Sequence, residues 1–344
     1  MIYPPETVVL SRDAGVGKSA IMRTEMAVSQ HFIAGVCGTG LENRYLYYWL
    51  QSAKPQFDRI ADGTTIKTIG LPYFRALRLP CPRLTEQRAI AAALSDVDTL
   101  LDGLDRLITK KRDLRQTAMQ QLLTGRSRLP RFRGEWQVER LGEHVEFLRH
   151  GVNARAELVA EGRVKYLHYG DVHASEGVYL SPASLPCLPD AKATALDRLQ
   201  DGDLVLADAS EDVAGVSKSV EITNVGDMEV VPGLHTIAAR FDQAVLADGF
   251  KGYLQFCPPF SSRLRRLAAG TKVYATNRAH VASIEMKLPF VAEQTAIASV
   301  LSDMDAEIAA LEAKRAKARS LKQGMMQELL TGRIRLVAPQ EHAV

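Results

Sequence analysis

Two long stretches of the chain place apolar residues at steps of three and four positions and are almost free of helix-breaking residues. From Thr85 to Leu123 there is no proline, and Gly103 is the only glycine. The apolar positions are Ile90, Leu94, Val97, Leu101, Leu104 and Ile108 in the first stretch, and Ile297, Leu301, Met304, Ile308, Leu311, Leu321, Met325 and Leu329 in the second. This spacing predicts two long helices, each with one narrow apolar seam.

Both predicted helices have recognisable ends. Thr85 is a suitable N-cap, and Gly125 and Gly332 stand where a glycine commonly ends a helix. At 1.5 Å per residue each helix is roughly 57 Å long, and a seam of that length needs a partner. We expect the helices to pair as an antiparallel coiled coil that holds two domains a fixed distance apart. The alternative is that each helix packs on its own domain.

The two stretches also repeat each other in sequence. Residues 86–129 match residues 293–336 without a gap, with 23 identities in 44 positions. The Glu-Gln pair at Glu86 recurs at Glu293, and the Leu-Leu-Thr-Gly-Arg tract that begins at Leu122 recurs at Leu329. Short repeats build solenoids, whereas this domain-sized repeat indicates that a unit of one domain and one helix occurs twice.

The segments outside the helices predict mixed α/β domains. Strand-like runs lie at residues 164–168, 203–206, 228–231 and 236–241, and short helices are expected at residues 250–257 and 261–268. The first domain resembles only the later part of the second: residues 61–64 align with residues 268–271, and residues 136–196 have no counterpart. We therefore expect a first domain that lacks the opening part of its twin.

Composition and charge set broad limits. No apolar run approaches the length of a membrane span, the N-terminal sequence is not a signal peptide, and the four cysteines form no zinc or disulfide pattern. We therefore expect a cytoplasmic protein. The net charge is only +3, but residues 249–284 carry six basic residues and no acidic one. This basic stretch fits an anion site or a solvated helix face equally well.

A family resemblance rests on the doubled helix signature. The tract LPCPRLTEQRAI at residues 79–90 leads into a helix that ends in QQLLTGR at residues 120–126, and the arrangement occurs twice. Over nearly its whole length the chain resembles the specificity (S) subunit of type I restriction–modification enzymes. The resemblance implies a non-catalytic subunit that recognises double-stranded DNA and docks methyltransferase subunits, which in turn bind restriction and translocase subunits. S-adenosylmethionine, ATP and Mg²⁺ would belong to those partners, with no cofactor in this chain.

The same resemblance implies an α+β fold in which two target-recognition domains alternate with two long helices that form an antiparallel coiled coil. Its segments are a shortened first recognition domain at residues 1–84, a first helix at 85–129, a second recognition domain at 130–291, a second helix at 292–336 and a tail at 337–344. The family would have a complete first recognition domain, which is where this chain departs from the pattern.

Candidate DNA-binding residues follow the basic stretch. Thr271 and Lys272 suit phosphate, Tyr274 suits stacking on a base, and Asn277 and Arg278 carry the groups that read base edges. A second tier comprises Lys218 and His235 in the second domain, and Arg12, Lys18, Gln30 and Lys67 in the first. The loop before Ser19 and its twin before Ser219 would offer lysine, serine and backbone N–H groups to DNA phosphate.

Other functional classes have weaker support. Residues 13–19 resemble part of a nucleotide-binding P-loop, but Arg12 stands where that motif needs its first glycine. Glu285 and Lys287 resemble the end of a nuclease motif without its other carboxylates, and the dispersed histidines make a poor metal set. The chief alternative to DNA recognition is a coiled-coil scaffold whose flanking domains bind proteins.

Overall fold

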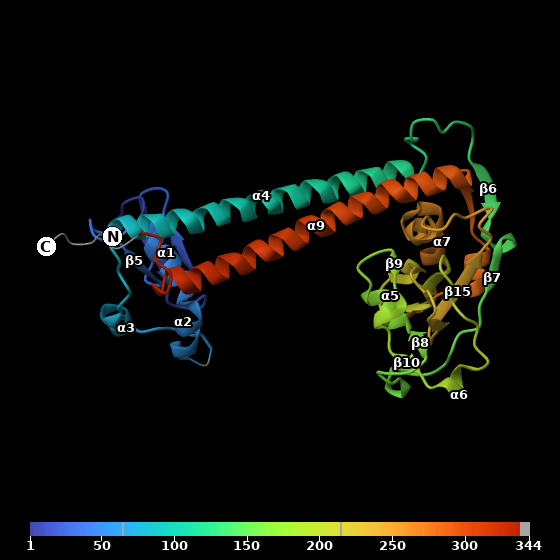
Figure 1. Cartoon of the computed structure of the whole chain (residues 1–344), viewed down its shortest axis with the longest axis horizontal. Helices are drawn as coiled ribbons and strands as arrows, with labels where there is room; N and C mark the ends of the chain where they lie inside the picture. The colour runs from blue at the N-terminus through green and yellow to red at the C-terminus, as the bar shows by residue number, and fades with distance from the viewer. Residues whose placement is uncertain (64, 214, 271, 338–344) are drawn as a thin grey trace. The chain divides into compact units, whose positions relative to one another are not determined.

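A computed structural model describes residues 1–63, 65–213, 215–270 and 272–337 (Figure 1). The chain forms two compact units: Met1–Lys110 with Ile308–Val344, and Lys111–Glu307. We call these the first unit and the second unit. The two long helices, α4 (Leu84–Leu122) and α9 (Val291–Leu329), each contribute to both units, and the fold of each unit is described separately below.

The first unit contains a small α/β domain. Its three-stranded antiparallel sheet has the order β3-β2-β5, formed by Ser19–Ile21, Val8–Ser11 and Phe32–Gly35, and β1 (Ile2–Tyr3) pairs with β4 (Met26–Ala27). The helices α1 (Asn43–Ser52), α2 (Lys54–Ile60) and α3 (Leu71–Ala76) follow the sheet. Val8, Leu10 and Phe57 are buried at the centre of this domain.

The second unit contains a larger α/β domain built on a five-stranded sheet of order β7-β15-β11-β13-β9. These strands are Val145–Phe147, Thr236–Phe241, Leu204–Ala207, Ser219–Ile222 and Tyr179–Leu180. A second sheet has the order β10-β8-β14 (Cys187–Leu188, Val164–Leu167, Glu229–Pro232), β17 (Glu285–Leu288) pairs with β6 (Gln137–Arg140), and β12 (Ala209–Ser210) pairs with β16 (Tyr274–Ala275).

Short helices complete the second domain, namely α5 (Tyr169–Ala174), α6 (Asp190–Ala193), α7 (Pro258–Leu267) and α8 (Arg278–Ala282). There are also 3₁₀ turns at Leu141–Glu143, Arg155–Glu157, Pro182–Ser184, Gly215–Ser217 and Lys251–Phe256. All four strands expected from the sequence are confirmed within one or two residues. The helix expected at residues 250–257 is a 3₁₀ helix, and the one expected at 261–268 begins three residues earlier.

Strand β11 shows why its sequence is apolar throughout. Successive side chains of a strand point to opposite faces of the sheet. Leu204 and Leu206 accordingly join one core cluster, whereas Val205 and Ala207 join another on the other face. The centre of the sheet is therefore covered on both sides, which removes the alternation of apolar and polar residues that marks a half-exposed strand.

The two domains share a common substructure. The order β3-β2-β5 in the first domain matches β13-β11-β15 in the second, and both trios are antiparallel. In the second domain β7 pairs with β15 and β9 pairs with β13. Among the described residues of the first domain, no strand occupies either position. The three shared strands of the first domain therefore correspond to β11, β13 and β15 of the second.

The long helices have the expected ends with one exception. Both are 39 residues long. Gly125 and Gly332 follow them with φ values of 69° and 75°, the left-handed conformation that glycine adopts without strain. The predicted N-cap at Thr85 is wrong, because α4 already begins at Leu84 and Thr85 lies inside the first turn.

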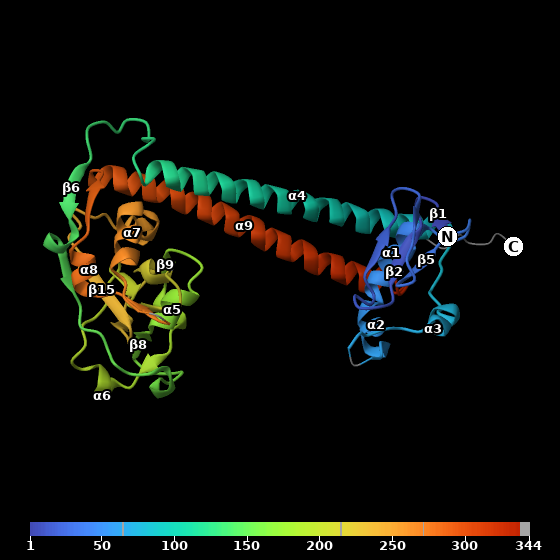
Figure 2. The same ribbon diagram turned by 180° about the vertical axis from the view of Figure 1, so that it is seen from behind.

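Within each unit, segments of α4 and α9 pair in opposite directions (Figures 1 and 2). In the second unit, Lys111 and Arg115 of α4 form ion pairs with Glu307 and Asp305 of α9. In the first unit, Arg315 pairs with Asp105 and Lys322 pairs with Asp98. The partner's number falls as the residue number rises, so the pairing is antiparallel, as the sequence predicts.

The seam residues combine two kinds of packing that the sequence presents as alternatives. Ile90 and Leu94 are buried against α1 and against Leu329 near the end of α9. Ile297 and Leu301 join the core of the second domain together with Leu122 and neighbouring residues from the end of α4. Each helix therefore begins on its own domain and, at the same place, packs against the end of the other helix.

Burial along the rest of the seam is uneven. Leu104, Ile108 and Ile308 are buried, whereas Val97, Leu101, Met304 and Leu311 are half-buried. Leu321 was expected on the seam, but its side chain is 57% exposed, so that assignment is wrong. Helical spacing alone placed it on the seam, and the tertiary contacts leave its side chain in solvent.

Buried glutamines fix the start of each helix to its domain. The Gln87 side chain accepts from the backbone N–H of Glu42 and donates to the carbonyls of Gly40 and Pro82. The Gln294 side chain accepts from the N–H of Ala247 and donates to the carbonyls of Val245 and Pro289. The same amide thus satisfies three backbone groups in each unit, and this explains the repeated glutamine.

The neighbouring glutamates bind arginines that follow the end of the opposite helix. Glu86 is buried and pairs with Arg335, whose guanidinium lowers the pKa of the Glu86 carboxyl through its hydrogen bonds and charge. Glu293 is likewise buried and pairs with Arg128. A buried carboxylate needs such a partner, because desolvation of an unpaired charge is costly.

A Ser-Asp-x-Asp motif also recurs, at residues 95–98 and 302–305, and it has a similar structural use. In the first unit, the Tyr48 hydroxyl lies 2.8 Å from Asp98 Oδ2 and 3.1 Å from Ser95 Oγ. In the second unit, the Tyr253 hydroxyl donates to Asp305, and Ser302 lies 3.3 Å from the Tyr179 hydroxyl. Much of the doubled sequence signature is therefore explained by the docking of each helix on its domain.

Glu221 is a buried carboxylate in the second domain with an unusual titration. Its oxygens accept from the N–H groups of Gly249 and Gly252, yet burial raises its pKa from 4.5 to about 7. The folded state therefore favours the protonated form. A raised carboxyl pKa contributes stability that is complete below the unfolded pKa and is lost as the pH rises through the folded value.

We predict that Gln294→Ala lowers the free energy of unfolding by about 2–4 kcal/mol, because one N–H and two carbonyl groups lose their buried partner. Urea unfolding followed by tryptophan fluorescence measures the change. Gln323→Ala, at an exposed position of α9, is the matched control and should stay within about 0.5 kcal/mol of the parent. Equal effects of the two substitutions would contradict the anchoring role of Gln294.

We also predict that the parent protein loses stability between about pH 4.5 and pH 7 relative to Glu221→Gln, by an amount on the order of 3 kcal/mol. The neutral amide does not titrate in this range, so the difference isolates the carboxyl group. Thermal unfolding of both proteins at several pH values provides the measurement. Parallel stability profiles would show that Glu221 keeps an ordinary pKa.

Candidate nucleic-acid interface

The candidate interface lies where the three shared strands of the second domain meet their loops. Strand β11 ends at Ala207, β13 begins at Ser219 after Lys218, and β15 begins at Thr236 after His235. The turn closed by the bridge between Ala269 and Ala275 joins the same edge, because the N–H of Thr276 donates to the carbonyl of Asp208 over 2.8 Å. We call this edge the loop end of the second domain.

Lys272 lies in this turn with an exposed side chain. Tyr274 is half-buried and packs against the main core of the domain, so only part of its ring is open to a base. Thr271 lies outside the described residues. Of the three residues predicted in this turn, Lys272 is thus the one whose described side chain is fully available to a phosphate.

Asn277 and Arg278 both make contacts within the domain. The Asn277 side chain caps α8 by accepting from the N–H of His280 over 3.0 Å. Arg278 Nη2 donates to the carbonyl of Leu148 over 2.6 Å, and its guanidinium lies over the Phe147 ring. In this conformation Arg278 Nη2 is therefore engaged with the domain's own backbone.

Lys218 and Ser219 are also drawn into the domain. The Lys218 ammonium donates to the carbonyl of Ser175 over 2.8 Å, and burial lowers its pKa. Ser219 is fully buried in β13, so the prediction that its hydroxyl reaches DNA phosphate is wrong. A lysine and a serine in a loop signature cannot reveal which of them the following strand will bury.

His235 remains at the surface of the loop end. Its ring Nδ1 lies 3.1 Å from Asp208 Oδ1, and its backbone has a positive φ of 57°. Tyr169 packs edge-on against the same ring, with the ring centroids 5.5 Å apart. His235 therefore combines an exposed imidazole with a fixed orientation, which suits contact with a base edge.

A hollow of about 500 Å³ opens at this end of the domain. Its walls are Tyr169, Gly170, His173, Ala209, Ser210, Glu211, Asp212, His235 and Val273. Aromatic and imidazole rings offer stacking surfaces, while carboxylates accept hydrogen bonds from the amino group of cytosine. The hollow also carries acidic groups, so the loop end is not uniformly basic and the positive charge of Lys272 stands beside it.

Sequence patterns did not predict a role for Tyr169, His173, Glu211 and Asp212. His173 Nε2 lies 2.9 Å from the carbonyl of Ala209, and it reaches the hollow from helix α5. Nothing in the local sequence links α5 to the loop after β11, because strand pairing brings the two segments together. A weak signal was present in the tract from Tyr169 to His173, which places an aromatic ring and an imidazole on one turn of helix.

In the first domain, the four predicted residues gather at the equivalent edge. Arg12 follows β2, Lys18 precedes β3 and Gln30 lies shortly before β5. The carbonyl of Lys67 accepts from the N–H of Ala14, which brings the turn around residue 67 to the same place. Lys18, Gln30 and Lys67 are exposed, whereas the Arg12 side chain donates to the carbonyl of Ile69.

The two loop ends share a histidine–aspartate contact. His31 Nδ1 lies 2.8 Å from Asp13 Oδ2 in the first domain, as His235 lies beside Asp208 in the second. Each histidine directly precedes the third shared strand, and each aspartate follows the first shared strand within two residues. The structure thus brings all the described second-tier candidates to corresponding edges of the two domains.

Other site classes find little support among the described residues. No group of three or more His, Cys, Asp and Glu side chains in that part of the chain could hold a metal ion. No described helix is long and apolar enough to cross a membrane.

Comparison with known proteins gives consistent results. A family profile described as "Type I restriction modification DNA specificity domain" matches residues 1–110. The chain is 25% identical over 307 residues to the type I restriction enzyme MjaVIII specificity subunit of Methanocaldococcus jannaschii, covering 86% of this chain and 71% of that protein. It is 33% identical over 106 residues, or 30% of the chain, to a type I specificity subunit of Mycoplasma pneumoniae described as putative.

Solved structures show the same fold. The crystal structure of the type I restriction–modification S subunit from M. genitalium superposes with a TM-score of 0.61 at 15% identity, covering 95% of this chain and 83% of that one. A structure described as the basis of complex assembly and conformational transition of the type I system gives a TM-score of 0.59 at 17% identity, covering 97% and 83%. The predicted α+β fold with two paired long helices is confirmed.

Proposed function

We propose, from its membership of the type I restriction–modification specificity-subunit family, that this chain is the DNA sequence-recognition subunit of such a complex. It recognises double-stranded DNA through its α/β domains and acts as part of a larger restriction–modification assembly. Chemistry on the DNA would be carried out by partner subunits, which would also hold S-adenosylmethionine, ATP and Mg²⁺.

The observation that carries the proposal is the doubled docking of helix on domain. The same buried glutamine and glutamate–arginine pair recur in both units, at Gln87 and Glu86 and again at Gln294 and Glu293. Each unit thus holds one α/β domain rigidly on a long helix. A protein that reads a two-part DNA site needs such fixed domains, because flexible attachment would cost binding free energy.

The second domain is the better equipped reader. Its loop end combines the exposed Lys272, the oriented ring of His235 and a hollow lined by Tyr169 and His173. Phosphate contacts position a protein on DNA, whereas contacts with base edges specify the sequence. We assign the first role to Lys272 and the second to the hollow beside it.

The helices also offer a surface for a protein partner. Leu100 and Leu107 of α4 lie in the first unit, seven residues apart on one helix face, and are 44% and 39% exposed. Apolar side chains at this spacing on a paired helix suit a partner helix packed alongside. We propose that a methyltransferase subunit docks here.

We predict that Lys272→Gln weakens binding to every duplex by a similar factor and reduces the slope of log K against log [salt] by about 0.9, as expected for one lost phosphate contact. His235→Ala should instead reduce discrimination at one base position, by about 1–3 kcal/mol. Selection from a random duplex library, followed by titrations at several salt concentrations, measures both effects.

Arg163→Gln is the matched control, because Arg163 is an exposed arginine directly before β8 that pairs with Asp190 and Glu229. It should leave sequence preference unchanged. If the parent protein enriches no sequence and binds duplexes without salt dependence, the proposed DNA reading is wrong. A coiled-coil scaffold would then explain the fold better.

We further predict that Leu107→Glu abolishes copurification of the methyltransferase partner while the helix content measured by circular dichroism stays unchanged. A charge at a half-exposed position costs the folded chain little but would be buried without a partner in the complex. Lys110→Glu, at an exposed position of the same helix, controls for the added charge. Retention of the partner by Leu107→Glu would show that this face of α4 does not dock it.

A further inference from the structure

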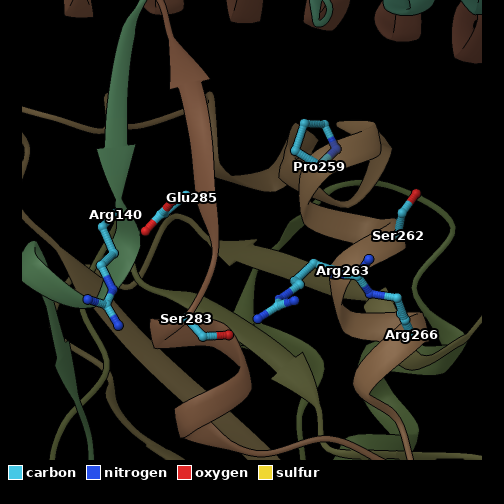
Figure 3. Close-up of a pocket in the computed structure, with 7 residues that line it drawn as sticks. All are labelled: Arg140, Pro259, Ser262, Arg263, Arg266, Ser283 and Glu285. Atoms are coloured by element: carbon cyan, nitrogen blue, oxygen red, sulfur yellow. The ribbon is translucent and has the colours of Figure 1, made fainter.

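A second hollow of the second domain is lined by arginines and lies apart from the hollow beside His235. It has a volume of about 570 Å³, and its walls include Arg140, Arg263, Arg266, Ser262, Ser283 and Glu285. Arg140 stands on β6, Glu285 faces it on β17, and Arg263 and Arg266 stand one turn apart on α7 (Figure 3). Figure 3 shows the Arg263 side chain extending from α7 toward the space in front of β17.

The arginines are not neutralised within the described part of the chain. Arg140, Arg263 and Arg266 make no side-chain hydrogen bond or ion pair with the residues that the structure describes. Glu285 lies directly opposite Arg140 in the strand pair, but their charged groups are not within ion-pair distance. Three guanidinium groups around one hollow repel each other, and an anion held between them would relieve that repulsion.

The chemistry of the lining favours phosphate over a protein surface. A protein partner is usually anchored by buried aromatic or aliphatic side chains. The described lining also includes Pro259, which is its one apolar residue. The other lining residues are charged or carry hydroxyl groups. Guanidinium groups bind phosphate oxygens in a bidentate manner, and serine hydroxyls commonly add a further donor.

The elements that line this hollow directly precede and follow, in sequence, the turn that carries Lys272. Helix α7 ends at Leu267, two residues before the turn that carries Lys272 begins, and Ser283 follows α8 on the other side of that turn. Arg265 Nη2 also reaches Ser217 in the loop before β13. Helix α7 before the turn and Ser283 after α8 thus both line the arginine hollow, and the turn between them is the one proposed to contact DNA.

The first domain keeps part of this charge at the corresponding positions. Extended to the residues that precede it, the offset of the repeat places Arg59 opposite Arg266 and Arg78 opposite Glu285, while Gln56 replaces Arg263. The isolated bridges Asp62–Thr68 and Ala269–Ala275 support the same register. Both domains therefore carry an arginine at the Arg59 and Arg266 position, whereas Arg78 of the first domain stands where the second has the acidic Glu285.

We propose that the arginine hollow binds a backbone phosphate of the DNA duplex whose bases are read at the loop end. This inference rests on the proposed function. It adds a second phosphate contact, at the arginine hollow, to the one assigned to Lys272. Arg263 and Arg266 hold the phosphate oxygens, and Arg140 contributes its charge from β6. The Glu285 carboxylate repels the phosphate and so lowers the affinity of the hollow for it.

The test is duplex binding by the full-length chain with its methyltransferase partner. Arg263→Gln should lower the salt slope by about 0.9, so that the ratio of parent to variant affinity changes roughly threefold between about 50 and 200 mM salt, equally for selected and random duplexes. Glu285→Gln should raise affinity, which loss of folding cannot do. Arg163→Gln, which removes an exposed arginine elsewhere in the domain, should change neither quantity.

A duplex with a single neutral methylphosphonate linkage locates the contact. Moved along the site, this linkage should weaken binding of the parent at one position and have no further effect on Arg263→Gln at that position. This loss of additivity identifies the phosphate that the hollow holds.

Different outcomes separate this inference from the function on which it rests. If Lys272→Gln weakens binding and the arginine variants do not, the chain reads DNA but the hollow does not touch it. If Arg263→Gln weakens only the selected duplex, the contact is to a base, and the phosphate assignment is wrong. Loss of the methyltransferase partner with unchanged DNA binding would assign the hollow to a protein carboxylate. Absence of duplex binding by the parent would overturn the proposed function itself.

Discussion

A buried side-chain amide at the start of each long helix underlies the architecture of both units. Gln87 and Gln294 each satisfy three backbone groups of their own domain, in sites from which water is excluded. A buried backbone group without a partner costs more free energy than one hydrogen bond contributes. The start of each helix therefore has one favourable position on its domain. A domain seated in this way keeps its orientation on the helix.

The same places join the two helices to each other. Glu86 and Glu293 lie beside the glutamines and bind Arg335 and Arg128 from the chain that follows the opposite helix. In each unit the start of one long helix therefore binds both its own domain and the chain that follows the other helix. A buried pair of this kind contributes specificity more than stability, because the desolvation of both ions offsets much of their attraction. Its repetition explains why the sequence signature is so strong in residues that touch no ligand.

The proposed DNA-reading surface is built differently. Its groups come from the ends of β11, β13 and β15, from α5 and from the turn after α7, and they include both acids and bases. A reader of base edges needs this mixture, because acceptors and donors must match those of the bases, whereas phosphate contacts need only positive charge. The two hollows are separate for the same reason, since the arginine hollow is proposed to bind phosphate and the hollow beside His235 to contact base edges.

Local sequence patterns were sufficient to predict the two long helices, their glycine ends, the doubling of the unit and four strands of the second domain. These features depend on periodicity and on repetition, which a sequence displays directly. Tertiary contacts, in contrast, expose Leu321, bury Ser219 and turn Arg278 back to Leu148. They also bring Tyr169 and His173 to the loop end, and Arg140 to α7. The direction and neighbours of a side chain depend on contacts between segments far apart in the chain, and no local pattern records those contacts.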